Sequence, residues 1–472
     1  MSQVLSLSRP AVGAAESRRW WVLGIVVAAQ FMYVMDAFIV NVALPTMARD
    51  LNASASQIEA VIAVYFMAYA TLIITGGRLG DIHGAKRIFI LGIAGFTLAS
   101  LWCGFAQSGT ELIVARLAQG GTAALMVPQV LATIHVLFSD DARPKAFAIY
   151  GIVLGLGGAA GFLFGGVLVT LNLLGLGWRS VFFVNVPFGV IIAVAAALMI
   201  PQAPRRDAVR LDVLGAAVLF VGLACLIGPL LFGRDLHWAS SVWAIMALGA
   251  AILIAFIALE RTIAAKGGLP LIDLALLADP AFTRGLAATF LFFFANLSFY
   301  LVMTLYMQSG LGIAPVNAGL ALMPLAIGFV VSSRQSAARV ATRGIRTLIE
   351  GCVLQLVGLA GVVALVEFVP QPTVLLLMLP LAVFGYGQGF VMGPLSGVVL
   401  STVPKSSAGS GSGLYGTVTQ IANAVGIAVV GGVFFAFHDA GAERVALLAA
   451  LAVVAATLVG CCGCLVLRIR AA

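Results

Sequence analysis

Two charged residues, Asp36 and Arg116, lie within long apolar segments of this 472-residue chain. An ionised carboxylate at the centre of a bilayer costs about 2.5–3.5 kcal/mol on insertion scales, so it must be protonated, paired or in contact with water. A carboxyl group in that position can bind a proton from one side of a membrane and release it to the other. Asp36 is therefore the candidate proton-carrying residue, and a structural hydrogen bond to a neighbouring helix is the alternative.

Arg116 is the candidate partner of Asp36. At 1.5 Å of rise per residue, Asp36 lies about 12 Å before the end of a helix that closes at Leu44, in the outer half of that helix. Arg116 lies about 8 Å into its own helix, counted from the same side of the membrane. These similar depths predict that Arg116 modulates Asp36, and a fixed structural ion pair is left open as the alternative.

The composition explains where such a pair sits. Hydrophobic residues make up 62% of the chain and charged residues 9%, so most of it must be surrounded by lipid. In lipid each spanning segment must be a helix, because only a helix satisfies its own backbone there. We predict fourteen spans, at about 20–44, 57–77, 87–106, 111–138, 145–171, 181–200, 212–232, 240–260, 284–307, 316–336, 346–366, 373–395, 407–437 and 443–467.

The basic residues fall on alternate connections between these spans. One side receives Arg18, Arg19, Lys86, Arg87, Arg143, Lys145, Arg205, Arg206, Arg210, Arg261, Lys266, Arg284, Arg339, Arg343, Arg346, Lys405, Arg468 and Arg470, and the other only Arg49, Arg179, Arg234 and Arg444. The positive-inside rule then places both termini in the cytoplasm and the chain in the cell membrane. The net charge of +8 is a topology signal and predicts no nucleic-acid partner.

The remaining acids are few. Glu111, Asp212, Glu260, Glu350 and Glu367 all fall near span ends, where we expect water to solvate them. No second deep carboxylate is present among the last six spans, residues 284–467. This scarcity argues against divalent cations as substrates and favours neutral, zwitterionic or singly charged amphipathic compounds.

Sites for metals, nucleotides or catalysis are not expected. The six cysteines lie in or at the edge of spans, and the cluster Cys461, Cys462 and Cys464 has no His or acidic ligand beside it. The sequence contains no phosphate-binding glycine-lysine loop, so it does not imply the use of ATP. We therefore predict that the chain is not an enzyme, holds no metal and uses no cofactor apart from protons as the coupling ion.

A compact polar segment between the second and third spans carries a family resemblance. Its pattern consists of Gly77, Leu79, Asp81, Gly84, Lys86 and Arg87, and it resembles the signature loop of the major facilitator superfamily. Ile82 and Ala85 depart from the pattern, since the family often has arginines there. The glycines permit a sharp turn, and Asp81 can accept charge-assisted hydrogen bonds or face a helix N-terminus, which would latch one conformation.

Further stretches resemble the fourteen-helix drug:proton antiporter branch of that family. They are residues 35–45 around Asp36, residues 178–189, residues 211–215, residues 413–428 with Thr419 where an arginine is common, and Arg116 with Gln119 and Gly120, a motif thought to aid proton transfer. The resemblance implies an all-α major-facilitator fold of two pseudo-symmetric six-helix bundles, at 1–200 and 284–472. Two extra linker helices and a connection would occupy 201–283.

A degenerate internal sequence repeat supports the presence of two related bundles. Residues 339–346 lie between the tenth and eleventh spans and resemble a degenerate copy of the first signature loop, with Thr342 where aspartate would fall.

A glycine stripe marks the fifth span. Gly157, Gly161 and Gly165 recur every four residues and permit close helix approach, either for packing or as part of a conformational gate. The antiporter motif of the family has a glycine-proline pair here, whereas this chain has Phe162 after Gly161. The expected kink site is absent, which weakens the inference of antiport in particular.

Several polar and aromatic residues are candidates for a substrate cavity. They are Tyr33, Asn41, Tyr65, Tyr69, Asn296, Tyr300, Gln308, Tyr386, Gln388, Gln420 and Asn423, each with helix packing as the alternative. The leading hypothesis is a proton-driven exporter of small molecules that works by alternating access and functions as a monomer in the bilayer. The alternatives are a dedicated exporter of one metabolite, amino acid or lipid, and a non-transporting sensor or scaffold.

Overall fold

The computed structural model describes residues 12–138, 142–202, 212–266, 268, 270–404 and 407–469. Fourteen helices within these ranges are long and apolar enough to cross a membrane, which is the number predicted from the sequence. The described residues contain no strand, and the predicted all-α membrane fold is confirmed. Predictions that involve Arg205, Arg206, Arg210, Leu211, Lys405 and Arg470 fall outside the described residues.

The first half of the chain forms the helices α1 to α7. Their bounds are α1 Val12–Asp50, α2 Ala55–His83, α3 Ala85–Phe105, α4 Gly109–Leu137, α5 Arg143–Leu171, α6 Ser180–Phe183 and α7 Asn185–Met199. Short 3-10 turns, η1 Leu173–Gly175 and η2 Gly177–Arg179, lead into α6, and η2, α6 and α7 together make the sixth span.

The second half begins with two helices that belong to neither bundle, α8 Val213–Phe232 and α9 Ser240–Ala265. The segment η3 Leu274–Ala278 follows. The last elements are α10 Pro280–Leu305, the π-helical turn η4 Tyr306–Gly310, α11 Pro315–Arg343, α12 Arg346–Phe368, α13 Val374–Leu400, α14 Ala408–His438 and α15 Glu443–Ile469.

The signature segment is more helical than its sequence suggested. Residues Gly77 to His83 form the last turns of α2, and α3 starts at Ala85, so the connection is the single residue Gly84 with φ of +93°. A side chain at that φ would be strained, which explains glycine there. The prediction of a polar loop over residues 77–87 was wrong, because α2 continues to His83 and α3 begins at Ala85.

The repeat region has the same construction. Residues 339–343, predicted as a connection, belong to α11, and α12 starts at Arg346. Gly344, with φ of +58°, makes the break between the two helices. Gly84 and Gly344 thus mark corresponding breaks between long helices, although the second break consists of two residues, Gly344 and Ile345.

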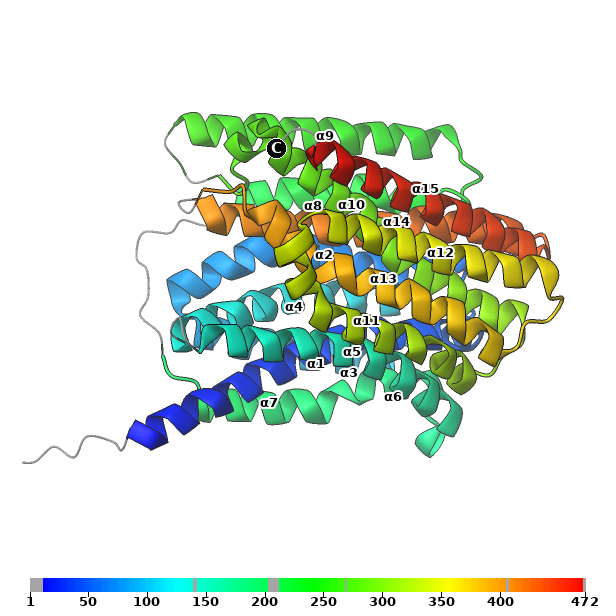
Figure 1. The fold of residues 1–472 in the computed structure, drawn as a ribbon, viewed down its shortest axis with the longest axis horizontal. Coiled ribbons are helices and arrows are strands. Elements are labelled where there is room, and N and C mark those ends of the chain that lie inside the picture. Colours follow the sequence, from blue (N-terminus) through cyan, green and yellow to red (C-terminus); the bar gives the residue numbers. More distant parts are fainter. Residues whose placement is uncertain are drawn as a thin grey trace, which may run out of the picture.

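Packing divides the helices into two groups. Helices α1 to α7 pack mainly on one another, α10 to α15 do the same, and the two groups meet where α5 contacts α11 and α2 contacts α14. Helices α8 and α9 form a hairpin beside this seam, with α8 against α2 and α14 (Figure 1). Figure 1 shows α9 at the outer edge of the molecule.

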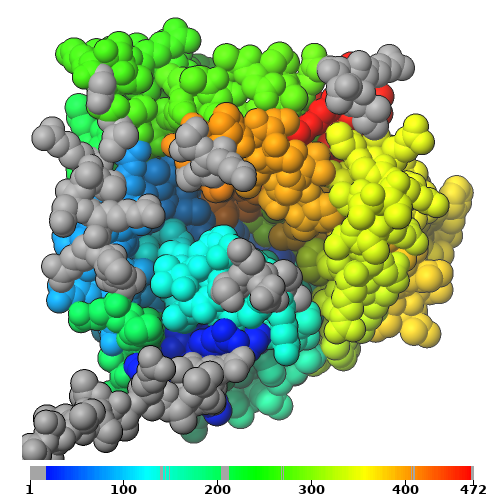
Figure 2. All heavy atoms as spheres, turned by 60° about the vertical axis from the view of Figure 1, so that its left-hand side comes forward, coloured from blue at the N-terminus to red at the C-terminus, as the bar shows by residue number. Residues whose placement is uncertain are grey.

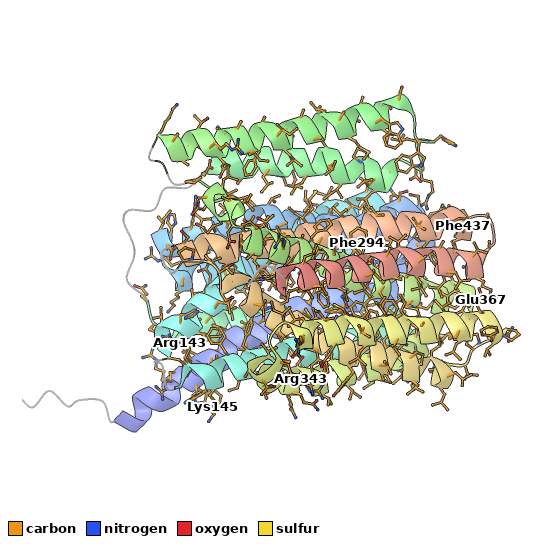
Figure 3. The ribbon with its side chains drawn as sticks, turned by 45° about the horizontal axis from the view of Figure 1, so that its top comes forward. Arg143, Lys145, Phe294, Arg343, Glu367 and Phe437 are labelled. Atoms are coloured by element: carbon orange, nitrogen blue, oxygen red, sulfur yellow. The ribbon has the colours of Figure 1, made fainter. Side chains whose placement is uncertain are left out.

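The helix ends gather at two ends of the molecule. We call the end that carries Gly84 and Gly344 the signature end, and the end that carries the turn at Asn52 the opposite end. Arg143 and Lys145 lie toward the signature end, whereas Glu367 and Phe437 lie toward the opposite end (Figure 3). The basic residues were predicted to face the cytoplasm, so the signature end is the expected cytoplasmic side.

The seam between the groups is closed at the opposite end. Gln308 in η4 donates a hydrogen bond to the carbonyl oxygen of Val42 in α1, with a distance of 2.9 Å. The backbone of α5 at Phe162 also approaches Gly319 of α11 closely. A Cβ on Gly319 would lie only 2.5 Å from the Phe162 carbonyl oxygen. From the signature end, the surface is hollowed between the cyan, orange and yellow-green parts (Figure 2).

Candidate functional site

Asp36 lies near the middle of the first span, which runs from Arg18 to Asp50. Its side chain is fully buried. It lies nearer the middle of the helix than predicted, because α1 continues one and a half turns beyond Leu44 and stays helical through Pro45. Asp36 is therefore 18 residues from the Arg18 end of the span and 14 residues from the Asp50 end.

Three side chains donate hydrogen bonds to this carboxylate. Arg116 Nη1 lies 2.6 Å from Oδ2, while Gln119 Nε2 and Asn185 Nδ2 lie 3.0 Å and 2.7 Å from Oδ1. All three partners are donors, and an ionised carboxylate accepts without donating. The arrangement therefore fits the ionised form of Asp36, which is compensated by a positive charge and two amides.

Arg116 holds its guanidinium group through several contacts. Its Nε donates to the carbonyl oxygen of Val61 in α2 at 3.1 Å, and its Nη1 also donates to Gln119 Oε1 at 2.6 Å. The guanidinium carbon lies 4.1 Å from the ring centre of Tyr65, a cation–π geometry. Its Nη2 is buried and has no hydrogen-bond partner among the described residues.

Helix α4 presents two members of the site on one face. Arg116 and Gln119 are three residues apart, the spacing at which helical side chains are neighbours. Gln119 Nε2 also donates to Ser100 Oγ on α3 at 2.8 Å, and Cys103 Sγ lies 3.6 Å from Gln119 Oε1. Gln119 thus connects the ion pair to α3.

Sequence reasoning missed two members of this network, Ser100 and Asn185. Asn185 was noticed only as part of a family-like stretch, and Ser100 was not singled out. Both are fully buried, and Asn185 Nδ2 lies 3.5 Å from Ser100 Oγ. A lone asparagine inside an apolar span was the available signal, because such a group needs a partner in lipid.

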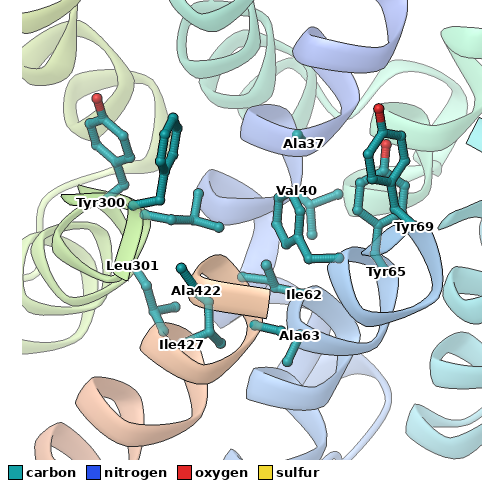
Figure 4. Close-up of a cluster of buried hydrophobic side chains, with 14 of the residues drawn as sticks. Ala37, Val40, Ile62, Ala63, Tyr65, Tyr69, Tyr300, Leu301, Ala422 and Ile427 are labelled. Carbon is teal, nitrogen blue, oxygen red and sulfur yellow. The ribbon is translucent and has the colours of Figure 1, made fainter. Parts of the chain in front are cut away.

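An aromatic cluster lies beside the ion pair. Tyr33 stacks on Tyr65 and Tyr69 with ring centres 6.0 Å and 5.2 Å apart, and all three side chains are buried. In Figure 4, Tyr65 and Tyr69 lie next to each other on α2, while Tyr300 of α10 lies across α1 and α14 from them. Tyr33, Tyr65 and Tyr69 therefore form one cluster, and Tyr300 lies apart from it.

Tyr300 belongs to a contact between the two groups of helices. Its ring centre lies 5.4 Å from that of Phe38 on α1 and 5.3 Å from that of Phe162 on α5. Its hydroxyl donates to Gln388 Oε1 on α13 at 2.6 Å. Tyr300 and Gln388 are thus brought together as predicted cavity residues, next to aromatic rings from the first bundle.

The other cavity candidates are dispersed. Asn41 donates to the carbonyl oxygens of Ala37 and Phe38 in its own helix, and Asn296 pairs with Gln355 inside the second bundle at 2.7 Å. Asn423 donates to Gln420 at 3.0 Å, and Gln308 closes the opposite end. Tyr386 donates to Gln335 and lines an apolar surface groove with Pro324 and Ile327.

The glycine stripe of α5 faces α1. A Cβ on Gly161 would lie 2.7 Å from Phe38 Cβ and 2.8 Å from the Met35 oxygen, and one on Gly165 would lie 2.8 Å from the Ile39 oxygen. Gly157 meets Val34 in the same way. These close approaches allow α5 to pack directly on the turn of α1 that carries Asp36.

The signature residues lie at one helix junction. Asp81 is exposed and has no hydrogen-bond or ion-pair partner within the described ranges. Lys86 donates to the Ala197 oxygen at 2.7 Å, Arg87 is exposed, and Gly77 lies near Pro128 of α4. The predicted latch through Asp81 is therefore not engaged in this arrangement.

The acids near span ends divide into two kinds. Glu350 and Glu367 are exposed and pair with Arg343 and Arg444, as solvated placement predicts. Glu111 is partly buried and accepts from the Gln107 backbone and from Trp102.

The prediction for Glu260 was wrong. Its side chain is fully buried, because the segment after α9 folds back and the Ile272 backbone donates to it at 2.8 Å. Glu59, which sequence reasoning passed over, is 1% exposed, and its nearest cation is Arg234 at 3.8 Å. Both residues stand close to a predicted span end, where one-dimensional position does not distinguish burial from solvation.

No group of three or more His, Cys, Asp or Glu side chains that could hold a metal ion occurs among the residues that the structure describes.

Comparisons with known proteins show the family of this chain. The family model described as Major Facilitator Superfamily matches residues 26–427. The chain is 37% identical to a probable actinorhodin transporter of Streptomyces coelicolor over 89% of this chain and 73% of that protein. It is 33% identical to a puromycin resistance protein of Streptomyces alboniger over 88% and 82%, and 29% identical to the multidrug resistance protein Stp of Mycobacterium tuberculosis over 88% and 75%.

The solved structures agree on the fold. A structure titled for substrate recognition in proton dependent oligopeptide transporters superposes with a TM-score of 0.69, covering 97% of this chain and 98% of that chain, at 16% identity. At that identity the likeness concerns the fold alone.

Proposed function

The chain belongs to the major facilitator superfamily, and from this premise we propose that it exports amphipathic, neutral or singly positive small molecules in exchange for protons. The observation that carries the proposal is the buried carboxylate of Asp36, held by Arg116, Gln119 and Asn185. An acidic residue inside a membrane that is compensated by a cation and two amides is a functional site by default. Protons are the only coupling ion that the proposal requires.

Proton binding would act on the ion pair itself. A proton on Asp36 removes the negative charge that Arg116 pairs with, so the 2.6 Å contact loses its charge assistance. The guanidinium group would then seek other acceptors, and it already has one buried nitrogen, Nη2, without a partner among the described residues. Because Arg116 also binds the Val61 carbonyl, such a shift would move α4 relative to α2.

The proposed cycle uses the seam between the bundles. In the present arrangement the opposite end is closed through Gln308 and Val42, and the signature end is hollowed. Substrate would enter from the signature end, which we place in the cytoplasm with both termini. The bundles would then rock, release the substrate at the opposite end, and give Asp36 access to external protons.

The substrate surface would lie at the aromatic contact of the two bundles. Phe38, Phe162 and Tyr300 come from three helices and both bundles, and Tyr300 adds a hydroxyl bound to Gln388. Flat aromatic rings with few hydrogen-bonding groups suit amphipathic organic molecules. The scarcity of free acids near these rings favours neutral or singly charged compounds.

A dedicated exporter of one compound is the second candidate. Two relatives are named for single antibiotics, actinorhodin and puromycin, while a third is named for multidrug resistance. The higher identity to the first two favours a narrow substrate range. A sensor or scaffold is the least favoured function, since it requires no compensated acid in the membrane.

Purified protein in liposomes tests the proposal. An outward-directed or inward-directed proton gradient is imposed, an internal pH probe is followed, and actinorhodin, puromycin and unrelated amphipathic compounds are added in turn. A proton-coupled exporter dissipates the gradient only when a transported compound is present. Dissipation by several compounds indicates a broad range, dissipation by one indicates a dedicated exporter, and substrate movement without any proton flux would overturn the coupling.

A further inference from the structure

The two extra helices carry a second pair of carboxyl groups, separate from Asp36. Asp212 is the residue before α8, and Glu260 lies near the end of α9. A Cβ placed on Gly215 would lie within 3 Å of both Asp212 Oδ2 and Glu260 Oε1. The two oxygens therefore converge on one point, although 48 positions separate the residues in the chain.

Each carboxyl group uses its other oxygen to bind the backbone. Asp212 Oδ1 accepts from the Gly215 N–H at 2.8 Å and caps α8, and Glu260 Oε2 accepts from the Ile272 N–H at 2.8 Å. The facing oxygens, Asp212 Oδ2 and Glu260 Oε1, are buried and have no donor among the described residues. The Glu260 side chain is fully buried.

Two ionised carboxylates at this separation repel each other, and neither can donate. A single proton between Asp212 Oδ2 and Glu260 Oε1, the two oxygens that converge beside Gly215, would convert their contact into a hydrogen bond. Shared protons of this kind are the known solution for close carboxyl pairs. The third charged group facing the pair is Arg78 of α2, which acts on both acids and donates to the Pro270 carbonyl.

We propose that Asp212 and Glu260 form a second proton-binding site, in which one proton is held between Asp212 Oδ2 and Glu260 Oε1 on the linker helices. The site fastens the start of α8, the end of α9 and the returning segment at Ile272. Arg78 belongs to the signature segment, so the charge of the pair acts directly on the signature end of α2. The proposal also explains the glycine of the stretch 211–215, because any Cβ on Gly215 would separate the two oxygens.

Conservative variants of the full-length protein in detergent test this site by thermal unfolding over a range of pH. Glutamine in Glu260→Gln accepts from Ile272 through its oxygen and donates to Asp212 through its amide, so it imitates the protonated pair. The parent binds a proton here when folded and is expected to lose stability as rising pH removes it. Glu260→Gln is expected to retain its stability over the same pH range.

A control and an independent readout complete the test. Glu350→Gln alters an exposed acid and is expected to keep the pH slope of the parent. Infrared spectra of the parent at neutral pH are expected to show a protonated carboxyl signal that survives Asp36→Asn and disappears in Glu260→Gln and in Asp212→Asn. Gly215→Ala is expected to weaken the same signal.

Three outcomes overturn the proposal. In the first, the unfolding midpoint of Glu260→Gln depends on pH as steeply as that of the parent. In the second, the infrared signal is unchanged in both Glu260→Gln and Asp212→Asn. In the third, the stability of the protein at constant pH changes with the sodium or potassium concentration. The last would assign a cation instead of a proton. If Glu260→Gln fails to fold, the spectra of the parent and of Asp212→Asn decide. None of these readouts involves transport, so they are independent of the function proposed for Asp36.

Discussion

Nη1 of Arg116 lies 2.6 Å from Oδ2 of Asp36, although 80 positions separate the two residues. Both side chains are fully buried. Removing one partner of a buried pair leaves an uncompensated charge and costs about 3–5 kcal/mol, whereas removing both costs far less. This asymmetry allows structural and functional contributions of the pair to be separated by experiment.

Asp36→Asn is expected to abolish uphill export while leaving downhill exchange of substrate. The amide cannot release a proton, so the variant cannot use a gradient, yet the bundles can still rock around a bound compound. The measurement is accumulation of substrate in energised inside-out vesicles, compared with exchange in vesicles without a gradient. The coupling role would be refuted by accumulation equal to that of the parent.

The stability of the same variant provides its control. Asp36→Asn alone is expected to lower the free energy of unfolding by about 3–5 kcal/mol if Arg116 stays charged. Combining it with Arg116→Leu is expected to recover part of that loss, because no lone charge remains buried. If Arg116→Leu lowers the free energy of unfolding as much in the Asp36→Asn background as in the parent, the two side chains do not stabilise each other.

Asn185→Val is expected to shift the pH profile of transport to higher pH. The substitution removes the 2.7 Å donor to Asp36, which stabilises only the ionised carboxylate, so a proton binds more readily. Initial rates measured across a pH series test this. Asn423→Val, which alters an asparagine paired with Gln420 on α14, is the matched control and is expected to leave the profile in place.

Gly161→Ala and Gly151→Ala, both on α5, are expected to have opposite effects. The Gly161 Cβ would lie 2.7 Å from Phe38 Cβ, and such overpacking costs about 1–3 kcal/mol. Nothing lies within 4 Å of a Cβ on Gly151, where alanine should stabilise the helix by up to about 1 kcal/mol. Thermal unfolding in detergent measures both, and equal shifts would show that the stripe does not set the approach of α5 to α1.

Gln308→Leu is expected to favour opening of the opposite end. The variant keeps a side chain of similar size but loses the hydrogen bond to Val42, one of the contacts that hold the bundles together there. Spin labels at Asn52 and Ala442, on turns of the two bundles at that end, report the separation by pulsed electron resonance. The closing role is contradicted if the distance distribution matches that of the parent.

The sequence predicted the membrane helices well because lipid imposes one rule on every span. A segment of sufficient apolar length must be helical and must cross, so the fourteen spans follow from local composition. Helix ends were less predictable. Polar residues such as those at 77–83 can continue a helix into the headgroup layer, and only the φ of Gly84 determines where the chain turns.

The site was predictable in part. Asp36 and Arg116 were identified because charge in lipid is costly, and a depth estimate was enough to propose their contact. Ser100 and Asn185 join them through the packing of α3 and α7, which one sequence does not reveal. Glu260 was misassigned because its burial depends on the return of residues 270–272, a tertiary event with no local pattern.

The three side chains that donate hydrogen bonds to Asp36 come from α4 and α7, within the first 200 residues. Under the coupling that we propose for Asp36, the energy of the proton gradient enters the protein through one half of the polypeptide. Changes at Tyr300 and Gln388, in the C-terminal half, could then alter which substrates are exported without changing any group that binds Asp36.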